Sequence, residues 1–192
     1  MKKTRFGYRA SFGEKIKQTY RVVGEPVDVH GAEQLAAENK FQFQSWALGL
    51  CGARPAGSGE AKKGADKGID GRLYFYNTTT GKTEQVIFSV KGGHLKATDV
   101  RDLRGVLDRE KAAIGVLISL EEPSRQMRTE AASAGFYKSG TVDKTSYPKM
   151  QLITVGELLA GKSVQMPNWH ESRTFKQAPK AKGKQTEQHP LF

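Results

Sequence analysis

The run Ile114–Leu120, IGVLISL, constrains the fold of this chain more than any other segment. It is almost continuously apolar, and segments with helical patterns lie on both sides of it. A short apolar run of this kind, without polar alternation, predicts a strand that is buried on both faces of a sheet. Such a strand needs helices above and below it, so the chain is expected to fold as an α/β protein.

The segments around this strand supply the other elements. Helices are predicted over Ala32–Lys40, Phe41–Leu50, Ala97–Lys111, Ser124–Ala134 and Val155–Ala160, and strands over Thr19–Val23, Ile69–Asn77, Glu84–Lys91 and Gln151–Val155. In the second helix, the apolar face is expected to consist of Phe43, Trp46, Ala47 and Leu50. This order predicts a three-layer α/β sandwich with a mixed central sheet, in which the closing strands run parallel.

The composition fits one soluble domain. Of the 192 residues, 37% are hydrophobic and 21 are glycine, which is enough apolar material for a core. No stretch approaches the roughly 18 consecutive apolar residues of a membrane-spanning helix. The basic N-terminus lacks the apolar region of a secretory signal, and one cysteine, Cys51, cannot form an internal disulfide. These features predict a cytoplasmic protein with no membrane partner, in which Cys51 is buried and is not a nucleophile.

The positive charge lies at the two ends of the chain. Residues 1–21 carry seven Lys or Arg and one Glu, and residues 162–192 carry six and two, whereas 18 basic and 17 acidic residues lie between them. We therefore divide the chain into a basic N-terminal arm (1–18), a central domain (19–161) and a basic, partly disordered tail (162–192). Flexible basic termini on a near-neutral domain indicate an anionic partner such as nucleic acid, although solubility alone would also explain them.

Two alternating runs, Ile69–Asn77 and Glu84–Lys91, are separated by the turn-forming residues TTTGK. Alternation on both sides of a turn is typical of a β-hairpin. If the turn centres near Thr79–Thr80, the numbers of paired residues sum to roughly 159–160.

This register has a chemical consequence at the open end of the hairpin. Asp70 is expected to lie beside Ser89 and Lys91. A carboxylate can hold a hard divalent cation, and a neighbouring lysine can position or deprotonate a water and stabilise negative charge on phosphorus. A simple cross-strand Asp–Lys pair on a solvated sheet face is the alternative interpretation.

The strings GADKGIDG and QVIFSVKGG resemble the half-sites of the PD-(D/E)xK nucleases, with an Asp followed by an acidic or amide residue, any residue and Lys. The likeness is greatest to the Mrr-type restriction endonuclease domain, as appended to some bacterial site-specific DNA methyltransferases. It extends through FQFQSWALGLCGARP before the hairpin and QLITVGELLAGK near the end, over roughly residues 20–165. The resemblance implies a restriction endonuclease-like fold and metal-dependent cleavage of DNA.

By the same resemblance, Asp70 corresponds to the metal-binding aspartate and Lys91 to the catalytic lysine. The second ligand of the family would fall at Ser89, and a serine hydroxyl is a weak neutral ligand for a metal. The carbonyl of Val90 would complete the site with Asp70, and Gln44 would stand for the Glu or Gln on the preceding helix. The implied cofactor is Mg²⁺, with Mn²⁺ as an alternative.

The expected contacts to DNA come from basic side chains around and after the hairpin. These candidates are Lys62, Lys63, Lys67, Arg72, Arg101 and Arg104. Contacts of this kind go mainly to the phosphates of double-stranded DNA and carry little sequence information. An ordinary solvated charged surface is the alternative for the individual arginines.

Two functions therefore compete at this point. The first is a metal-dependent endonuclease of the restriction-modification type, favoured by the pairing of Asp70 with Lys91. The second is a noncatalytic DNA-binding or accessory module on a degenerate nuclease fold, favoured by Ser89. A DNA methyltransferase is a candidate partner in both cases, and double-strand cleavage would call for a homodimer with two active sites.

Overall fold

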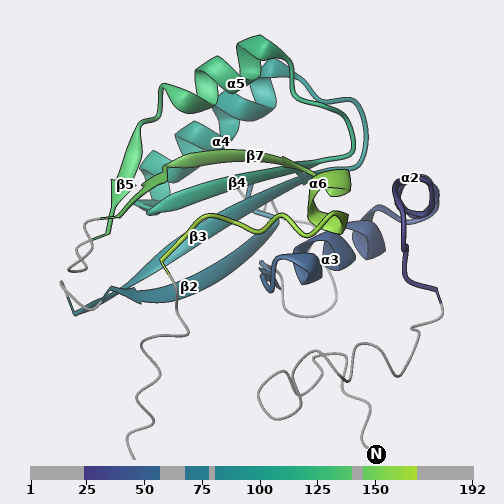
Figure 1. Cartoon of the computed structure of the whole chain (residues 1–192), viewed down its shortest axis with the longest axis horizontal. Coiled ribbons are helices and arrows are strands. Elements are labelled where there is room, and N and C mark those ends of the chain that lie inside the picture. The colour runs from purple at the N-terminus through teal and green to yellow at the C-terminus, as the bar shows by residue number, and fades with distance from the viewer. Residues whose placement is uncertain (1–23, 57–67, 78–80, 140–144, 168–192) are drawn as a thin grey trace, which may run out of the picture.

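The computed structural model describes residues 24–56, 68–77, 81–139 and 145–167. Its centre is a five-stranded mixed sheet in the order β1-β2-β3-β4-β7 (Figure 1). The strands are β1 (Arg54–Pro55), β2 (Gly71–Asn77), β3 (Lys82–Lys91), β4 (Ile114–Ser119) and β7 (Met150–Thr154). β1, β2 and β3 pair antiparallel, whereas β3, β4 and β7 run parallel, as predicted.

β4 lies between two parallel neighbours, and every residue in it is buried. Val116 and Ile118 face one apolar cluster, and Leu117 faces the other. A strand can contribute to two separate cores only when helices cover both faces of the sheet. The prediction made from the run Ile114–Leu120 is therefore confirmed.

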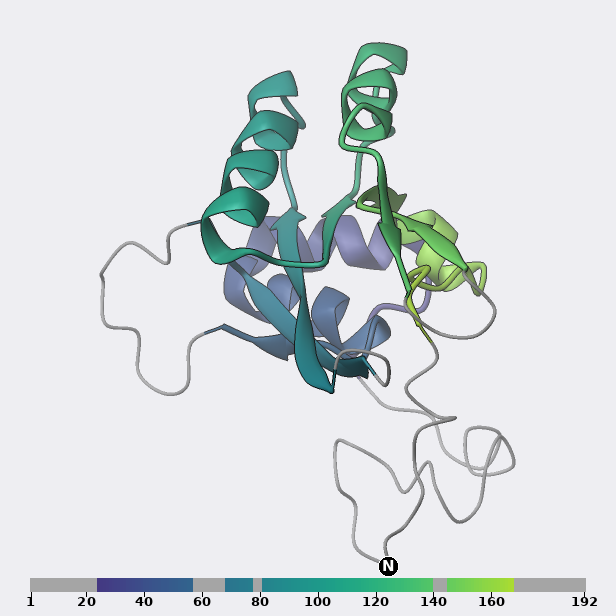
Figure 2. The same cartoon turned by 90° about the vertical axis from the view of Figure 1, so that its left-hand side faces the viewer.

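The two helical layers differ in their contents. One face of the sheet carries α2 (Val29–Glu38), α3 (Lys40–Leu50) and α6 (Val155–Leu159), and the other carries α4 (Ala97–Glu110) and α5 (Arg125–Ala132) (Figure 2). The fold is thus the predicted three-layer α/β sandwich. No helix among the described residues is long and apolar enough to cross a membrane.

Local sequence signals explain where these helices begin. The side chains of Asp28, Asn39 and Ser124 each accept a hydrogen bond from a backbone N–H in the first turn of the helix that follows. Thr154 and Glu157 form a reciprocal capping box at the start of α6. These caps satisfy donors that have no partner within the helix. The other helices begin within one residue of the predicted start, whereas α2 begins at Val29, three residues before the predicted Ala32.

The apolar face of α3 differs from the prediction at one position. Leu50 is 36% exposed, whereas Leu48 is completely buried. The reason is Gly71 on β2, because a side chain there would begin 2.4 Å from a methyl group of Leu48. The missing side chain makes room for Leu48 against the sheet, and helical periodicity alone does not reveal this contact.

Three short strands were not predicted. β1 lies between the predicted helix Phe41–Leu50 and the predicted strand Ile69–Asn77, and β5 (Phe136–Lys138) and β6 (Ser146–Pro148) form a separate two-stranded sheet. Asn77, at the end of β2, donates a hydrogen bond to the Tyr137 hydroxyl at 2.8 Å. Strands of two or three residues are too short to show an alternating pattern.

The predicted strand Thr19–Val23 and arm 1–18 lie outside the described residues, and the proposed domain boundaries stay predictions.

Candidate functional site

The hairpin of β2 and β3 has the expected register. Gly71 pairs with Phe88 and Leu73 with Val86, so the numbers of paired residues sum to 159. Asp70, one position before β2, donates its backbone N–H to the carbonyl of Phe88 at 2.9 Å. Its side-chain Oδ2 accepts a hydrogen bond from the backbone N–H of Val90 at 2.6 Å. The carboxylate predicted to bind a metal therefore lies at the open end of the hairpin.

Gln44 reaches the same place from α3. Its side-chain Nε2 donates to the backbone carbonyl of Asp70 at 3.4 Å, and this carbonyl also accepts from the N–H of Ala56 at 3.0 Å. The structure thus brings Gln44, Asp70 and Val90 together from three parts of the sequence. The amide of Gln44 is directed to the backbone of Asp70, which anchors the segment leading into β2.

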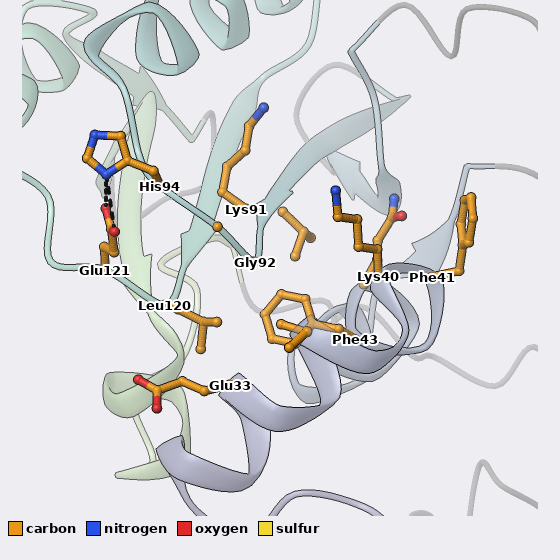
Figure 3. Close-up of a pocket in the computed structure, with 14 residues that line it drawn as sticks. Glu33, Lys40, Phe41, Phe43, Lys91, Gly92, His94, Leu120 and Glu121 are labelled. Atoms are coloured by element: carbon orange, nitrogen blue, oxygen red, sulfur yellow. Dashed lines mark hydrogen bonds and ion pairs between the residues drawn. The ribbon is translucent and has the colours of Figure 1, made fainter.

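Ser89 and Lys91 lie on β3, on either side of Val90, and their environments differ. Ser89 is 6% exposed. The Nζ of Lys91 forms an ion pair with Asp99 Oδ1 on α4 at 2.9 Å. Figure 3 shows the Lys91 side chain extending away from Phe43 and from helix α3. The lysine is thus held by a carboxylate on α4, a partner that sequence spacing did not indicate.

These side chains do not fit a resident Mg²⁺ ion. Such an ion prefers several oxygen ligands in near-octahedral geometry, and one or two of them are normally carboxylates. Asp70 uses one carboxylate oxygen to accept from Val90 N–H, and position 89 carries a neutral hydroxyl. Within the described residues, no group of three or more His, Cys, Asp or Glu side chains could hold a metal.

The predicted DNA contacts on the folded body are already engaged with other side chains. Arg72 donates to Gln85 and forms an ion pair with Glu110 at 3.0 Å, which connects β2, β3 and the end of α4. Hydrogen bonds from Arg72 and then Arg109 hold the pKa of Glu110 below its ordinary value. Arg72 therefore stabilises the packing of α4 against the hairpin.

The two arginines on α4 contact α5. Arg101 forms an ion pair with Glu130 at 3.0 Å, and Arg104 donates to the Ser133 hydroxyl at 2.9 Å. Lys62, Lys63 and Lys67 lie outside the described residues. The described residues include 15 Lys or Arg and 14 Asp or Glu, so the folded body is nearly neutral.

A groove beside the candidate site was not predicted. It has a volume of about 740 Å³ and lies where β3 and β4 end, between the loops that follow these strands and helices α2 and α3 (Figure 3). Ala36, Phe43, Val90 and Leu120 contribute apolar lining. The carboxyl ends of parallel strands commonly form such a crevice, and this topological rule was the available signal.

Charged side chains surround the groove. Glu33 and Lys40 come from the helices, whereas His94 and Glu121 come from the loops and form an ion pair when His94 is protonated. The hydrogen bond from the backbone N–H of Leu95, followed by that from His94, lowers the pKa of Glu121. The exposed position of His94 agrees with its place in a loop after β3.

Gly92 allows the floor of this groove to pack closely. A side chain at this position would begin 3.0 Å from the ring of Phe43 and 3.1 Å from the Cβ of Ala36. The glycine after the strand therefore lets the backbone approach α2 and α3.

Cys51 has no catalytic environment. Burial raises the pKa of its thiol to about 12, so the thiol stays protonated at neutral pH. Only a thiolate is an effective nucleophile, and the structure therefore agrees with a packing role for this residue.

A protein-family model matches the central part of the chain. A family described as NACHT-associated inactive Restriction Endonuclease 1 matches residues 58–160, which is more than half of the chain. The matched segment includes β2, β3, α4, β4, α5 and β7, and with them Asp70, Ser89 and Lys91. No curated protein sequence is significantly similar to the chain.

Two solved structures are similar to this fold. One is the DNA modification-dependent restriction endonuclease AspBHI, with 19% sequence identity, a TM-score of 0.49, and coverage of 76% of this chain and 36% of that chain. The other is the MspJI restriction endonuclease in complex with a 27-mer oligonucleotide, with 21% identity, a TM-score of 0.47, and coverage of 75% and 32%. The chain thus spans about a third of the length of these solved proteins.

Proposed function

Because the chain belongs to the NACHT-associated inactive Restriction Endonuclease 1 family, we propose that it is a noncatalytic DNA-binding module on a restriction endonuclease-like fold. The observation that carries this proposal is the side chain at position 89. A serine precedes Val90, whose backbone N–H binds the Asp70 carboxylate, at the position where an active site of this kind would supply a second oxygen ligand of greater strength.

The electrostatics of the site support the loss of catalysis. Metal-assisted hydrolysis of a phosphodiester depends on carboxylates that hold the ion close to the scissile phosphate. Here Asp70 accepts a backbone hydrogen bond, Ser89 contributes no charge, and Lys91 is paired with Asp99. These three features favour a protein that retains the shape of the nuclease domain without its chemistry.

The distribution of charge supports DNA as the partner. The whole chain has a net charge of +11, whereas the described residues have 15 basic and 14 acidic side chains. The remaining charge of +10 lies mainly in residues 1–23 and 168–192. Clustered Lys and Arg bind phosphates by releasing condensed counterions, and they do so with little dependence on sequence. We propose that double-stranded DNA is bound chiefly through these basic segments.

The second candidate function is a metal-dependent endonuclease of the PD-(D/E)xK superfamily and the Mrr type. It is favoured by Asp70, whose carboxylate accepts a hydrogen bond from the Val90 N–H, and by Lys91, the residue that follows Val90 at the open end of the hairpin. This function would call for Mg²⁺ or Mn²⁺, a homodimer for double-strand cleavage, and a methyltransferase that marks the host DNA. The observation against this function is that Asp70 and Ser89 together offer a metal only one charged side chain.

The family description also suggests a partner. Because the family is named as NACHT-associated, we propose that the module acts together with a NACHT-containing protein. In this arrangement, the module would bring its partner to DNA and would not cut the DNA itself. A DNA methyltransferase remains the alternative partner.

Plasmid cleavage and duplex binding, measured on the same proteins, test the proposed function. Wild type, Asp70→Ala and Lys91→Ala are incubated with supercoiled plasmid, methylated or unmethylated, in Mg²⁺ or Mn²⁺, and their binding to a labelled duplex is followed by fluorescence anisotropy. We expect no cutting by any of them, while all three proteins bind the duplex. Metal-dependent cutting by wild type that is lost in both variants would establish the nuclease, and absence of binding would reject the DNA-binding role.

A further inference from the structure

Lys91 is the basic residue of the candidate site, and its charge is neutralised from within the molecule. Its Nζ lies 2.9 Å from Asp99 Oδ1, and the two side chains are 37% and 13% exposed. The lysine belongs to the last position of β3, whereas the aspartate belongs to the first turn of α4. The pair therefore joins the candidate site to the helix on the other side of the loop that follows β3.

Asp99 is fixed in place by more than this ion pair. Its second oxygen, Oδ2, accepts a hydrogen bond from the backbone N–H of Lys96 at 2.8 Å. A carboxylate in the first turn of a helix is also favoured by the positive end of the helix dipole. The acid is thus preorganised before it meets the lysine, and the entropy lost when the two side chains pair is mainly that of the lysine.

The other charged groups near Lys91 are engaged elsewhere. On the hairpin, Asp70 Oδ2 accepts from the Val90 N–H. On the groove side, His94 and Glu121 pair with each other at 3.0 Å. Ser89, two residues before the lysine on the same strand, carries no charge.

We propose that the Asp99 carboxylate is an internal phosphate mimic, which occupies on Lys91 the position that a DNA phosphate would take. This inference rests on the proposed DNA-binding function and concerns the regulation of the same site. Carboxylate and phosphate oxygens accept the same charge-assisted hydrogen bonds from an ammonium group. Because the pair is partly exposed, solvent and phosphate can reach it, and partly exposed ion pairs are weak. The site is therefore masked in free protein and becomes cationic only when Asp99 is displaced or neutralised.

Duplex binding as a function of salt concentration tests this inference in the full-length protein. Asp99→Asn keeps an oxygen that can accept from Lys96 N–H but removes the charge that neutralises Lys91. Asp102→Asn is the matched control, since Asp102 is an exposed acid on the same helix. The double variant Lys91→Met/Asp99→Asn removes the lysine while it keeps most of the apolar stem. Thermal melting of each variant verifies that the protein is folded.

We expect Asp99→Asn to bind the duplex several-fold more tightly at low salt. The slope of log affinity against log salt should also become steeper by about 0.9, the value for one added phosphate contact on B-DNA. Asp102→Asn should give a smaller gain with an unchanged slope, and the gain should disappear in the double variant. Equal effects of the two aspartate variants, or a gain that persists without Lys91, would overturn the inference while duplex binding itself stands.

A second measurement tests, without DNA, whether Asp99 shields the Lys91 amine. The extent to which an amine-reactive reagent labels Lys91 is measured by mass spectrometry in wild type, Asp99→Asn and Asp102→Asn. We expect faster labelling of Lys91 in Asp99→Asn alone, and unchanged labelling would overturn the inference. If neither wild type nor any variant binds the duplex, the proposed function is rejected, and with it the proposal that Lys91 can bind a DNA phosphate.

Discussion

Position 89 lies on β3 directly before Val90, whose N–H binds the Asp70 carboxylate, and its side chain influences how much negative charge the candidate site can present to a cation. A serine hydroxyl contributes no charge, and the residue is 6% exposed. Because the Asp70 carboxylate accepts a hydrogen bond from the N–H of Val90, the residue after position 89, a carboxylate at position 89 would stand close to that of Asp70. Two acids that lie close together repel each other unless a cation lies between them.

We predict that Ser89→Glu creates a divalent-cation site. The affinity for Mn²⁺ should rise at least tenfold over wild type, and the variant should melt at a higher temperature with Mn²⁺ than without it, because ligands that bind only the folded state stabilise it. Electron paramagnetic resonance of free Mn²⁺ and thermal melting measure the two effects.

The control for this prediction is the same change in an Asp70→Asn background. If the new glutamate acts together with Asp70, the gain in Mn²⁺ affinity should be lost in the double variant. An equal gain in both backgrounds would show that Glu at this position binds the ion without Asp70, and the assignment of the pair would then be wrong.

At the scale of secondary-structure elements, the contact between α4 and β4 depends on a glycine. A side chain at Gly115 on β4 would begin 2.7 Å from a methyl carbon of Leu107, which is 1% exposed on α4. α4 also carries Asp99 at its start and Glu110, the partner of Arg72, at its end. The close packing at Gly115 therefore positions two residues that contact the hairpin.

We predict that Gly115→Ala lowers the free energy of unfolding by about 1–3 kcal/mol, the usual cost of overpacking a dense core. Gly105→Ala is the matched control on α4, because nothing lies within 4 Å of its added methyl group. It should stabilise the protein by roughly 0.5–1 kcal/mol, since alanine is the better helix former. Urea denaturation of the three proteins measures these changes, and a neutral Gly115→Ala variant would contradict the packing argument.

The hairpin was the element most fully predictable from sequence. Its alternating runs and the position of its turn lead to the observed sum of 159 for paired residue numbers. Helix starts were also predictable, because capping residues such as Ser124 act within four residues of the chain. The strands β5 and β6 were missed because they have three residues each and pair across a longer connection.

At the scale of the whole molecule, charge and fold are separated. The described residues have nearly equal numbers of basic and acidic side chains, and many of the arginines are ion-paired, as Arg101 is with Glu130 and Arg128 with Glu122. The tail from residue 168 onward contributes Arg173, Lys176, Lys180, Lys182 and Lys184 against two glutamates. Nonspecific attraction to DNA is therefore expected to come from the tail and the N-terminal arm.

We predict that Lys182→Gln/Lys184→Gln reduces the salt dependence of duplex binding more than Arg101→Gln/Arg128→Gln does. Each lost phosphate contact lowers the slope of log affinity against log salt by about 0.9, so the tail variant should lose roughly one to two units. The body variant should change the slope little, because its arginines already pair with glutamates. Fluorescence anisotropy over a range of salt concentrations measures both, and the reverse order would assign binding to the face of α4 and α5.

Local sequence was sufficient for the order of helices and strands, the burial of β4, the hairpin register and the presence of Asp70, Ser89 and Lys91 at one end of the hairpin. Each of these depends on apolar periodicity, turn residues or caps, which act over short distances along the chain. Tertiary packing decided the partners of the charged side chains. The spacing of Lys91 and Asp99 in the sequence does not predict their ion pair, because the pair forms only when α4 packs on β4 through Leu107 and Gly115. The ion pair at the candidate site is thus a consequence of how one helix packs on the sheet.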